Sequence, residues 1–236
     1  MTKVAILQSN YIPWKGYFDI IHDVDLFVFY DDLQYTKNDW RNRNRIKTPN
    51  GADWLTIPVG EDSHRLICDV EIKNPLWQTK HWKTFQQYYC KCPHFARYRT
   101  FLEEVYMGKH WRSLSDLNQY LIKEISRDFL AIKTTFKDSR EYALSGLKLE
   151  RLMDLVIQSG ASSYVSGPAA KDYIDPGRFN DRNIKLIWKD YSGYPEYPQI
   201  YPPFKHAVTV LDLLFNVGPD APWYIWGWRK GGSPLT

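Results

Sequence analysis

The sequence predicts an α/β protein with a mostly parallel, Rossmann-like sheet and a helical excursion in the middle of the chain. Two short apolar segments, residues 3–7 and 25–30, enclose an amphipathic segment that follows Pro13. Strands that are apolar throughout are typical of parallel sheets covered on both faces, and parallel neighbours need a crossover connection, usually a helix. Strand-like and helix-like segments alternate along much of the chain, which favours the same class.

Further strands are expected where β-branched and aromatic residues gather between turns, at residues 54–59, 68–72, 131–136, 163–166 and 184–188. Apolar residues at helical spacing predict three helices between residues 76 and 129, and further helices at residues 147–157 and 208–215. Residues 191–203 are rich in tyrosine and proline and are expected to form a loop.

Length and composition fit one globular unit. We expect residues 1–230 to form a single α/β domain with a helical insertion or subdomain at about 75–130, and residues 231–236 to be a disordered tail. Hydrophobic residues make up 44% and charged residues 25% of the chain, which excludes a disordered protein. No apolar segment approaches the ~20 residues that span a bilayer, and no secretory signal is recognisable. A cytoplasmic protein without membrane insertion is expected, and a homodimer is compatible with the sequence.

The charge and cysteine patterns limit the ligands. The formal net charge is +4, and five basic residues fall within residues 37–47. A cluster of this size suits a few phosphates, whereas nucleic acid needs a broad basic face, so no nucleic-acid partner is expected. Three cysteines imply no disulfide framework, and Cys90, Cys92 and His94 match no familiar zinc spacing, so we expect no metal site.

The loop after the first strand carries the first candidate site. Ligands of open α/β sheets bind beyond the carboxyl ends of the strands, where helix N-termini favour anions. Gln8, Asn10 and Lys15 supply amides and a cation there, and Trp14 supplies a flat apolar surface, so all four are predicted to bind substrate. The alternative is a helix entry capped by Asn10, with Trp14 packing only.

Paired carboxylates follow the second strand and reach the same edge of the sheet. Asp31 and Asp32 are suited to binding a ribose, a substrate amine or a Mg²⁺ carried by a nucleotide, and Gln34 follows them as a further substrate-binding candidate. We predict that Asp31 binds substrate and that Asp32 acts in catalysis. The alternative is a plain turn, because aspartate is common where strands end.

Residues 40–47 alternate arginine and asparagine. If this segment is extended, Arg43 and Arg45 lie on one face and Asn42 and Asn44 on the other. Guanidinium groups bind phosphate bidentately, so Arg43 is predicted to be catalytic and Arg45 to bind substrate, while Asn42 and Asn44 contact a sugar or base. A solvated edge strand explains the arginines equally well, but not the interleaved asparagines.

A fourth segment, residues 163–174, joins a strand to a turn with glycine and to Lys171 at the start of a helix. The layout suits an anion, and Lys171 is the catalytic candidate, although the spacing is not that of a Walker A loop. A plain helix N-terminus is the equal alternative.

Read together, these segments resemble the WbqC-like protein family. The resemblance rests on Gln8-Ser-Asn-Tyr-Ile-Pro-Trp14, Asp31-Asp-Leu-Gln34, Trp40-Arg-Asn-Arg-Asn-Arg-Ile46, Ser166-Gly-Pro-Ala-Ala-Lys171 and Leu211-Asp-Leu-Leu-Phe-Asn216, and it covers about residues 3–221. It implies a role in bacterial surface polysaccharide (O-antigen) biosynthesis. The expected activity is transfer of an amino acid, such as glycine, or another acyl group to the amine of a nucleotide-linked amino sugar.

The N-terminal half is also similar to the start of pantothenate synthetase and related nucleotidyltransferase-fold enzymes, which activate an acyl group with ATP before passing it to an amine. This similarity implies ATP with Mg²⁺ as a candidate cofactor, with no group bound tightly. Those enzymes carry a His-x-Gly-His motif, whereas the corresponding residues here are Trp14-Lys15-Gly16-Tyr17. Two alternatives stay open: a metal-assisted sugar-transferring or sugar-modifying enzyme, and a non-catalytic nucleotide-sugar binding protein.

Overall fold

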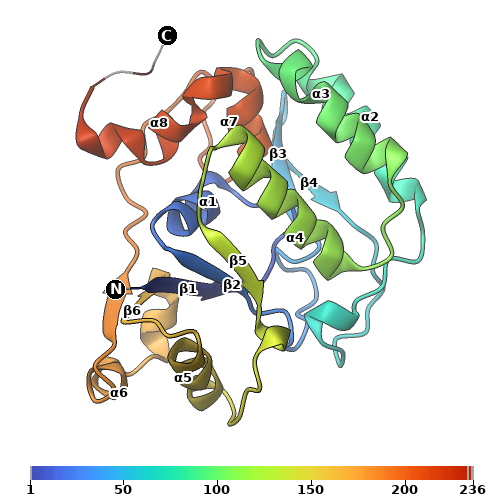
Figure 1. The fold of residues 1–236 in the computed structure, drawn as a ribbon. Helices are drawn as coiled ribbons and strands as arrows, with labels where there is room; N and C mark the ends of the chain where they lie inside the picture. Colours follow the sequence, from blue (N-terminus) through green and yellow to red (C-terminus); the bar gives the residue numbers. More distant parts are fainter. Residues whose placement is uncertain (1, 233, 235–236) are drawn as a thin grey trace.

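Five parallel strands form the central sheet in a computed structural model that describes residues 2–232 and 234 (Figure 1). The strand order is β5-β2-β1-β6-β7, and all four pairings are parallel. Their bounds are β1 Lys3–Leu7, β2 Leu26–Phe29, β5 Thr135–Asp138, β6 Ser163–Ser166 and β7 Lys185–Trp188. The prediction of an α/β protein with a mostly parallel sheet is therefore confirmed. The tail predicted to be disordered, residues 231–236, lies partly outside the described residues.

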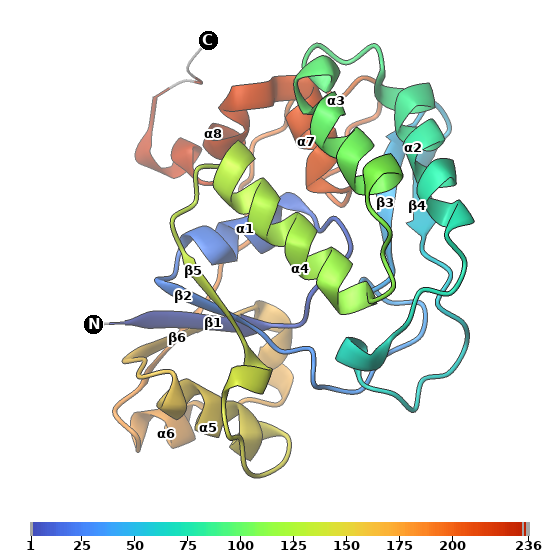
Figure 2. The ribbon, with the colours of Figure 1, turned by 45° about the vertical axis from the view of Figure 1, so that its right-hand side comes forward.

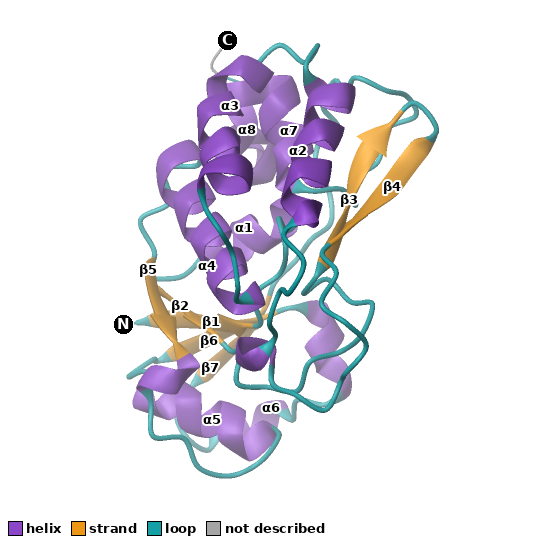
Figure 3. Cartoon of the chain, turned by 90° about the vertical axis from the view of Figure 1, so that its right-hand side faces the viewer, coloured by secondary structure: helices purple, strands orange, loops and turns teal. Residues whose placement is uncertain are grey.

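Both faces of the sheet are covered by helices, which explains why its strands are apolar on both sides (Figure 3). In β1, Ala5 packs into one hydrophobic cluster, whereas Val4 and Ile6 pack into another on the opposite face. The first face carries α1 Lys15–His22, α4 Leu114–Glu124, α7 Val210–Val217 and α8 Ala221–Ile225, and the second carries α5 Leu149–Gln158 and α6 Pro176–Asn180.

The excursion between β2 and β5 contains a hairpin and three helices, as Figure 2 shows. The antiparallel hairpin consists of β3 Arg43–Thr48 and β4 Gly51–Thr56. It is followed by α2 Leu76–Tyr89, α3 Phe95–Glu103 and α4, so the three helices expected in this region are confirmed. Short π-helical turns, Glu104–Gly108 and Ile125–Phe129, extend α3 and α4.

Three sequence-based element predictions are corrected. The strand expected at residues 68–72 is wrong: a 3-10 turn spans Ile67–Asp69, and the chain then lies along residues 112–114, with Ile72 N 2.7 Å from Arg112 O. With only this short partner, no strand can extend. The strand expected at 54–59 ends at Thr56, where β3 has no further residue to pair with, and the strand expected at 131–136 is shifted to β5.

A chain of hydrogen bonds ties the loop after β1 to the excursion. All its groups are satisfied when Tyr106 donates to the Tyr11 hydroxyl (2.6 Å), Tyr11 donates to His81 Nδ1 (2.8 Å), and His81 Nε2 donates to the Thr56 carbonyl (3.2 Å). Burial lowers the pKa of His81 to about 4, against the opposing effect of the hydrogen bond to Thr56. The imidazole is therefore neutral at neutral pH, as this chain of donors requires.

We predict that His81 makes the fold sensitive to acid. Its pKa is depressed in the folded chain, so protonation favours the unfolded chain, and stability present above pH 6.5 is lost as the pH falls towards 4. The loss attributable to this group is about 3 kcal/mol. Urea unfolding at pH 7 and pH 4.5 should show a clearly smaller acid loss for His81→Gln than for the wild type, whereas the exposed control His64→Gln should behave like the wild type.

Candidate functional site

A cavity of about 440 Å³ lies beyond the carboxyl ends of β1 and β6. These strands are neighbours, but the chain runs from β1 to β2 on one side of the sheet and continues to β6 and β7 on the other. Loops that diverge from such a switch point leave a crevice, which is where open α/β sheets bind ligands. Its walls come from the end of β1, from Tyr30, from the start of α5 at Lys148 and Leu149, and from Ser166 to Tyr173.

The polar groups of this switch-point cavity are few. Gln8 and Ser166 line it, and the hydroxyl of Tyr30 is buried without a hydrogen-bond partner among the described residues. Burial raises the pKa of Tyr30 to about 12, against a smaller opposing effect of Arg151, so this hydroxyl is a donor at neutral pH. Lys148 has φ 50°, a conformation that non-glycine residues rarely adopt and that clusters at functional sites.

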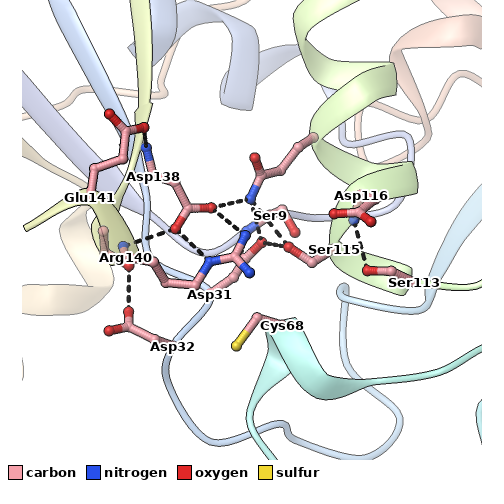
Figure 4. A network of polar contacts seen from close by, with 12 residues as sticks. Ser9, Asp31, Asp32, Cys68, Ser113, Ser115, Asp116, Asp138, Arg140 and Glu141 are labelled. Atoms are coloured by element: carbon pink, nitrogen blue, oxygen red, sulfur yellow. Dashed lines mark hydrogen bonds and ion pairs between the residues drawn. The ribbon is translucent and has the colours of Figure 1, made fainter.

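Asp31 is fully buried at the end of β2, and both its oxygens are in use (Figure 4). Oδ1 accepts from the main-chain N–H of Ser9 at 2.7 Å, and Oδ2 accepts from Ser115 at 2.5 Å and Gln119 at 3.1 Å. Ser115 and Gln119 belong to α4, so this carboxylate joins the loop after β1 to the helix that covers the sheet.

The network continues to the end of β5. Gln119 also donates to Asp138 at 2.7 Å, and Arg140 binds the two Asp138 oxygens at 2.8 Å each. Burial alone would raise the pKa of Asp138, but the bonds from Arg140 and Gln119 hold it below its ordinary value. The carboxyl edge of β1, β2 and β5 is therefore a closed set of charge-assisted hydrogen bonds.

Asp32 points to the other face of the sheet, towards α5. Its oxygens accept from Ser139 and from the Arg151 guanidinium. Asp31 and Asp32 thus separate to opposite faces, as neighbours in an extended chain do, and every oxygen of the two carboxylates accepts at least one hydrogen bond from the protein. Such a pair does not fit a resident Mg²⁺, and among the described residues no three His, Cys, Asp or Glu side chains gather as metal ligands.

The alternation of arginine and asparagine is present in the structure. Arg43 and Arg45 are half-buried on one face of β3, whereas Asn42 and Asn44 are buried on the other. Asn42 Nδ2 donates to the Ile57 carbonyl at 2.9 Å. Both asparagines bond to main-chain groups, so in this structure their amides support the protein itself.

Asn44 fixes the loop after β1. Its Nδ2 donates to the carbonyls of Tyr11 (3.0 Å) and Ile12 (2.9 Å), and its Oδ1 accepts from Arg45 N (2.7 Å). Ile12 has φ 37°, an outlier for a β-branched residue. Strain of this kind persists only where the surroundings determine the conformation. The Asn face of β3 therefore holds a strained loop in place.

Arg41, which precedes β3, brings two predicted substrate-binding residues together. Its guanidinium donates to Gln8 Oε1 at 2.7 Å and to Asn10 Oδ1 at 2.5 Å. Gln8 lines the switch-point cavity, and Asn10 lines a second cavity of about 220 Å³ together with Trp14 and Asn44. A single guanidinium therefore joins one wall residue of each cavity.

Trp14 and Lys15 begin α1. The indole of Trp14 lies over Gly16, where a Cβ would come within 2.2 Å of the ring, so only glycine fits there. Lys15 is buried, donates to the Pro195 carbonyl at 3.1 Å and faces the rings of Tyr194 and Tyr197. Burial lowers its pKa to about 8, against the attraction of Asp19.

The three residues predicted to be catalytic lie on separate elements. Asp32 contacts Arg151, Arg43 stacks on Trp54 with its Cζ 4.1 Å from the ring centroid, and Lys171 is exposed, 5.7 Å from the centroid of Trp188. In the described part of the chain no hydrogen bond or ion pair joins any two of them. Gln34 is also exposed, and it donates to the Ser63 carbonyl at 3.1 Å.

Sequence reasoning missed the residues that close the site from later elements. Gln119 and Arg151 lie on amphipathic helices, where a polar residue normally means a solvated face. The apolar pattern of residues 25–30 includes Tyr30 in a strand, but a side chain with a polar tip at the carboxyl end of a strand is a signal for a site residue. Trp54 gave no local signal, because its place opposite Arg45 depends on the hairpin register.

Comparison with known proteins assigns the chain to a family. The model of the WbqC-like protein family matches residues 8–224, which include every candidate site residue. The chain belongs to the WbqC-like protein family. It is also 46% identical over 227 residues to the uncharacterized protein Rv1507c of Mycobacterium tuberculosis, a match that covers 95% of this chain and 98% of that protein. No solved structure matches the chain.

Two further features bear on the class of this WbqC-like protein. Within residues 2–232 and 234, no helix has the length and apolar character needed to cross a membrane. The three cysteines are free, and burial raises the pKa of Cys68 to about 11 and of Cys92 to about 12, so neither is a thiolate nucleophile at neutral pH.

We predict that Asn44→Ala destabilises the fold by at least about 2 kcal/mol, because it leaves two buried carbonyls and one N–H without a partner and releases the strained Ile12. Asn50→Ala, an exposed change in the turn of the same hairpin, should stay within about 0.5 kcal/mol of the wild type. Equilibrium denaturation measures both, and equal stabilities would contradict the role assigned to Asn44.

Proposed function

We propose that this WbqC-like protein is a cytoplasmic transferase of bacterial surface polysaccharide (O-antigen) biosynthesis. It attaches an amino acid, such as glycine, or another acyl group to the amine of a nucleotide-linked amino sugar, with ATP as the source of energy. The single observation that carries this proposal is the switch-point cavity, because it lies where open α/β sheets bind nucleotides.

The strand order supports a nucleotide as the ligand. Numbered along the chain, the five parallel strands follow the order 3-2-1-4-5, the order of the first five strands of the Rossmann fold. This supports the Rossmann-like, nucleotidyltransferase-like description of the sheet. The volume of about 440 Å³ lies within the 300–1,000 Å³ that is typical of small-molecule sites.

The walls suit a nucleoside with a sugar. Tyr164 and Tyr173 offer flat apolar surfaces, Gln8 and Ser166 offer hydrogen bonds, and the Tyr30 hydroxyl is a buried donor that a ligand oxygen would satisfy. Lys148 at the start of α5 places a cation and a helix N-terminus at the same cavity, an arrangement that favours phosphate.

In this proposal Asp32 positions Arg151 and does not transfer a proton. Both its oxygens are engaged by Ser139 and Arg151, so it orients Arg151 beside Tyr30 and the cavity. Mg²⁺ enters with ATP as part of the substrate, because the aspartate pair does not fit a resident ion. The separation of Asp31 and Asp32 to opposite faces, each bonded to protein donors, counts against the alternative in which the pair holds a metal–nucleotide complex.

One observation favours a second candidate, a non-catalytic nucleotide-sugar binding protein. The residues that line the switch-point cavity include no Asp, Glu, His or Cys, the usual acids, bases and nucleophiles. Mass spectrometry separates the two functions. Full-length protein is incubated with ATP, an amino-acid mixture and UDP-, GDP- or dTDP-linked amino sugars, and the transferase forms an amide together with AMP or ADP. If a nucleotide sugar binds tightly but no product forms with any member of this panel, the result rejects the transferase and supports a non-catalytic binding protein.

We predict that Tyr30→Phe weakens binding of the nucleotide sugar roughly two- to tenfold, the value of one net hydrogen bond, and leaves folding intact because phenylalanine keeps the buried ring. Isothermal titration calorimetry with the sugar nucleotide found by thermal shift measures this change. The matched control is Tyr120→Phe on α4, outside the cavity. Equal affinities of the wild type and Tyr30→Phe would remove Tyr30 from the site.

A further inference from the structure

The hairpin presents an aromatic and basic surface next to the second cavity. This hairpin surface consists of Trp40, Arg43, Arg45 and Trp54. The guanidinium carbons of Arg43 and Arg45 lie 4.1 and 4.6 Å from the Trp54 ring centroid, and the Trp40 and Trp54 rings are 5.3 Å apart. Both indoles are exposed, to 40% and 39%, although tryptophan is highly buried on average.

The charge of this surface is not neutralised by the protein. Arg43 donates to the Asn38 carbonyl, and neither Arg43 nor Arg45 forms an ion pair among the described residues, whereas Arg41, Arg140 and Arg151 each pair with an aspartate. Lys47 follows on the same face of β3. Its Nζ is buried and has no hydrogen-bond partner in the described chain. Because Lys47 is fully buried and its charge acts on the buried Asp212, the accessible part of this strand face carries two cations, Arg43 and Arg45, about 6.8 Å apart along the strand.

The second cavity adjoins this surface, because Trp40 belongs to both. Its walls are Asn10, Pro13, Trp14, Trp40, Asn44 and Ala207. Main-chain hydrogen bonds lock these walls together, from Tyr11 N to Trp40 O (3.0 Å) and from Val210 N to Pro13 O (2.9 Å). The amide nitrogen of Asn10 makes no hydrogen bond within the described chain, so the cavity is preformed and keeps a donor for a ligand.

We propose that the second cavity and the hairpin surface bind a second nucleotide with a free 5′-phosphate chain, of the class of ATP. The base lies in the cavity between Trp14 and Trp40, and the phosphates lie against Arg43 and Arg45. About 220 Å³ is below the range for a whole small molecule, so the cavity takes only the ring, and the anionic part extends over the open surface. Flat rings stack on indoles, and guanidinium groups bind phosphate bidentately.

This inference rests on the proposed function, in which ATP is the second substrate. Arg41 supplies the geometric link, since it donates to Gln8 in the wall of the switch-point cavity and to Asn10 in the wall of the second cavity. The two ligands would therefore lie on either side of one guanidinium.

Isothermal titration calorimetry on the full chain tests the phosphate contacts, with ATP and pyrophosphate as probes. Arg43→Ala/Arg45→Ala should weaken binding of both roughly a hundredfold or more, because two charge-assisted contacts are lost. Arg97→Ala/Arg99→Ala is the matched control: it removes two exposed charges at the same spacing from α3 and should leave both affinities unchanged. Equal effects of the two double variants, or no effect of the first, would overturn the proposal.

Trp40→Leu tests the ring contact separately. It should weaken ATP and AMP roughly five- to a hundredfold and leave pyrophosphate unchanged, because pyrophosphate has no ring to stack. Equal losses for AMP and pyrophosphate would overturn the placement of the base. A single-stranded oligonucleotide that binds more tightly than ATP, with a steep salt dependence, would instead show a nucleic-acid surface.

Measuring nucleotide-sugar affinity alongside ATP affinity shows whether this inference or the proposed function has failed. If the two sites are separate, Arg43→Ala/Arg45→Ala weakens ATP and spares the nucleotide sugar, and Tyr30→Phe does the reverse. Absence of nucleotide-sugar binding in the wild type would end the proposed function but leave the hairpin site standing. If Arg43→Ala/Arg45→Ala binds neither ATP nor the nucleotide sugar, and circular dichroism shows that it is folded, the two ligands share one site. That result would overturn the separate hairpin site.

Discussion

The loop between β1 and α1 is held by hydrogen bonds from several other parts of the chain, and the geometry of both cavities depends on it. Asp31 binds Ser9 N from the end of β2, Asn44 of β3 binds the carbonyls of Tyr11 and Ile12, and Arg41 binds the side chains of Gln8 and Asn10. These contacts hold Ile12 at a φ that its β-branched side chain disfavours. Because the partners come from residues 31–44, the excursion helps to shape the site at the carboxyl edge of the sheet.

The same contacts explain why the site segments of this chain combine charged and amide residues. A buried carboxylate or amide is tolerated only when its hydrogen bonds are satisfied, and Asp31 and Asn44 satisfy theirs with main-chain groups of the loop or with side chains of α4. Arg43 and Arg45, in contrast, keep their charge uncompensated on the outer face of β3. Within residues 40–47, therefore, the inward Asn44 sets the conformation of the loop after β1, whereas the outward Arg43 and Arg45 remain free to contact a ligand.

The fold could be predicted largely from local patterns, because apolar strands covered on both faces and a helix between parallel neighbours leave clear periodicities. The strands β1, β2, β6 and β7 follow the prediction within one residue at each end, and a helix lies between β1 and β2 as expected. The prediction was wrong at residues 68–72, since an apolar extended segment does not reveal whether a partner strand exists. The candidate site was less accessible. The sequence indicated which loops carry polar residues, but Asp31 and Asp32 separate to opposite faces, and their partners Gln119 and Arg151 are 88 and 119 residues away.

Two cavities whose wall residues Gln8 and Asn10 are joined by Arg41 suit the proposed function, in which the protein brings two ligands together. The switch-point cavity offers tyrosine rings and a hydroxyl donor, which matches a nucleoside and sugar, whereas the hairpin surface offers indoles and uncompensated cations, which matches a base with free phosphates. The difference is one of charge: Lys148 is the one cation among the described residues that line the first cavity, whereas the hairpin surface carries both Arg43 and Arg45. A ligand with a diphosphate already esterified to a sugar needs less neutralisation than a free triphosphate. In the proposed function, therefore, the nucleotide sugar would occupy the switch-point cavity and ATP would occupy the hairpin site.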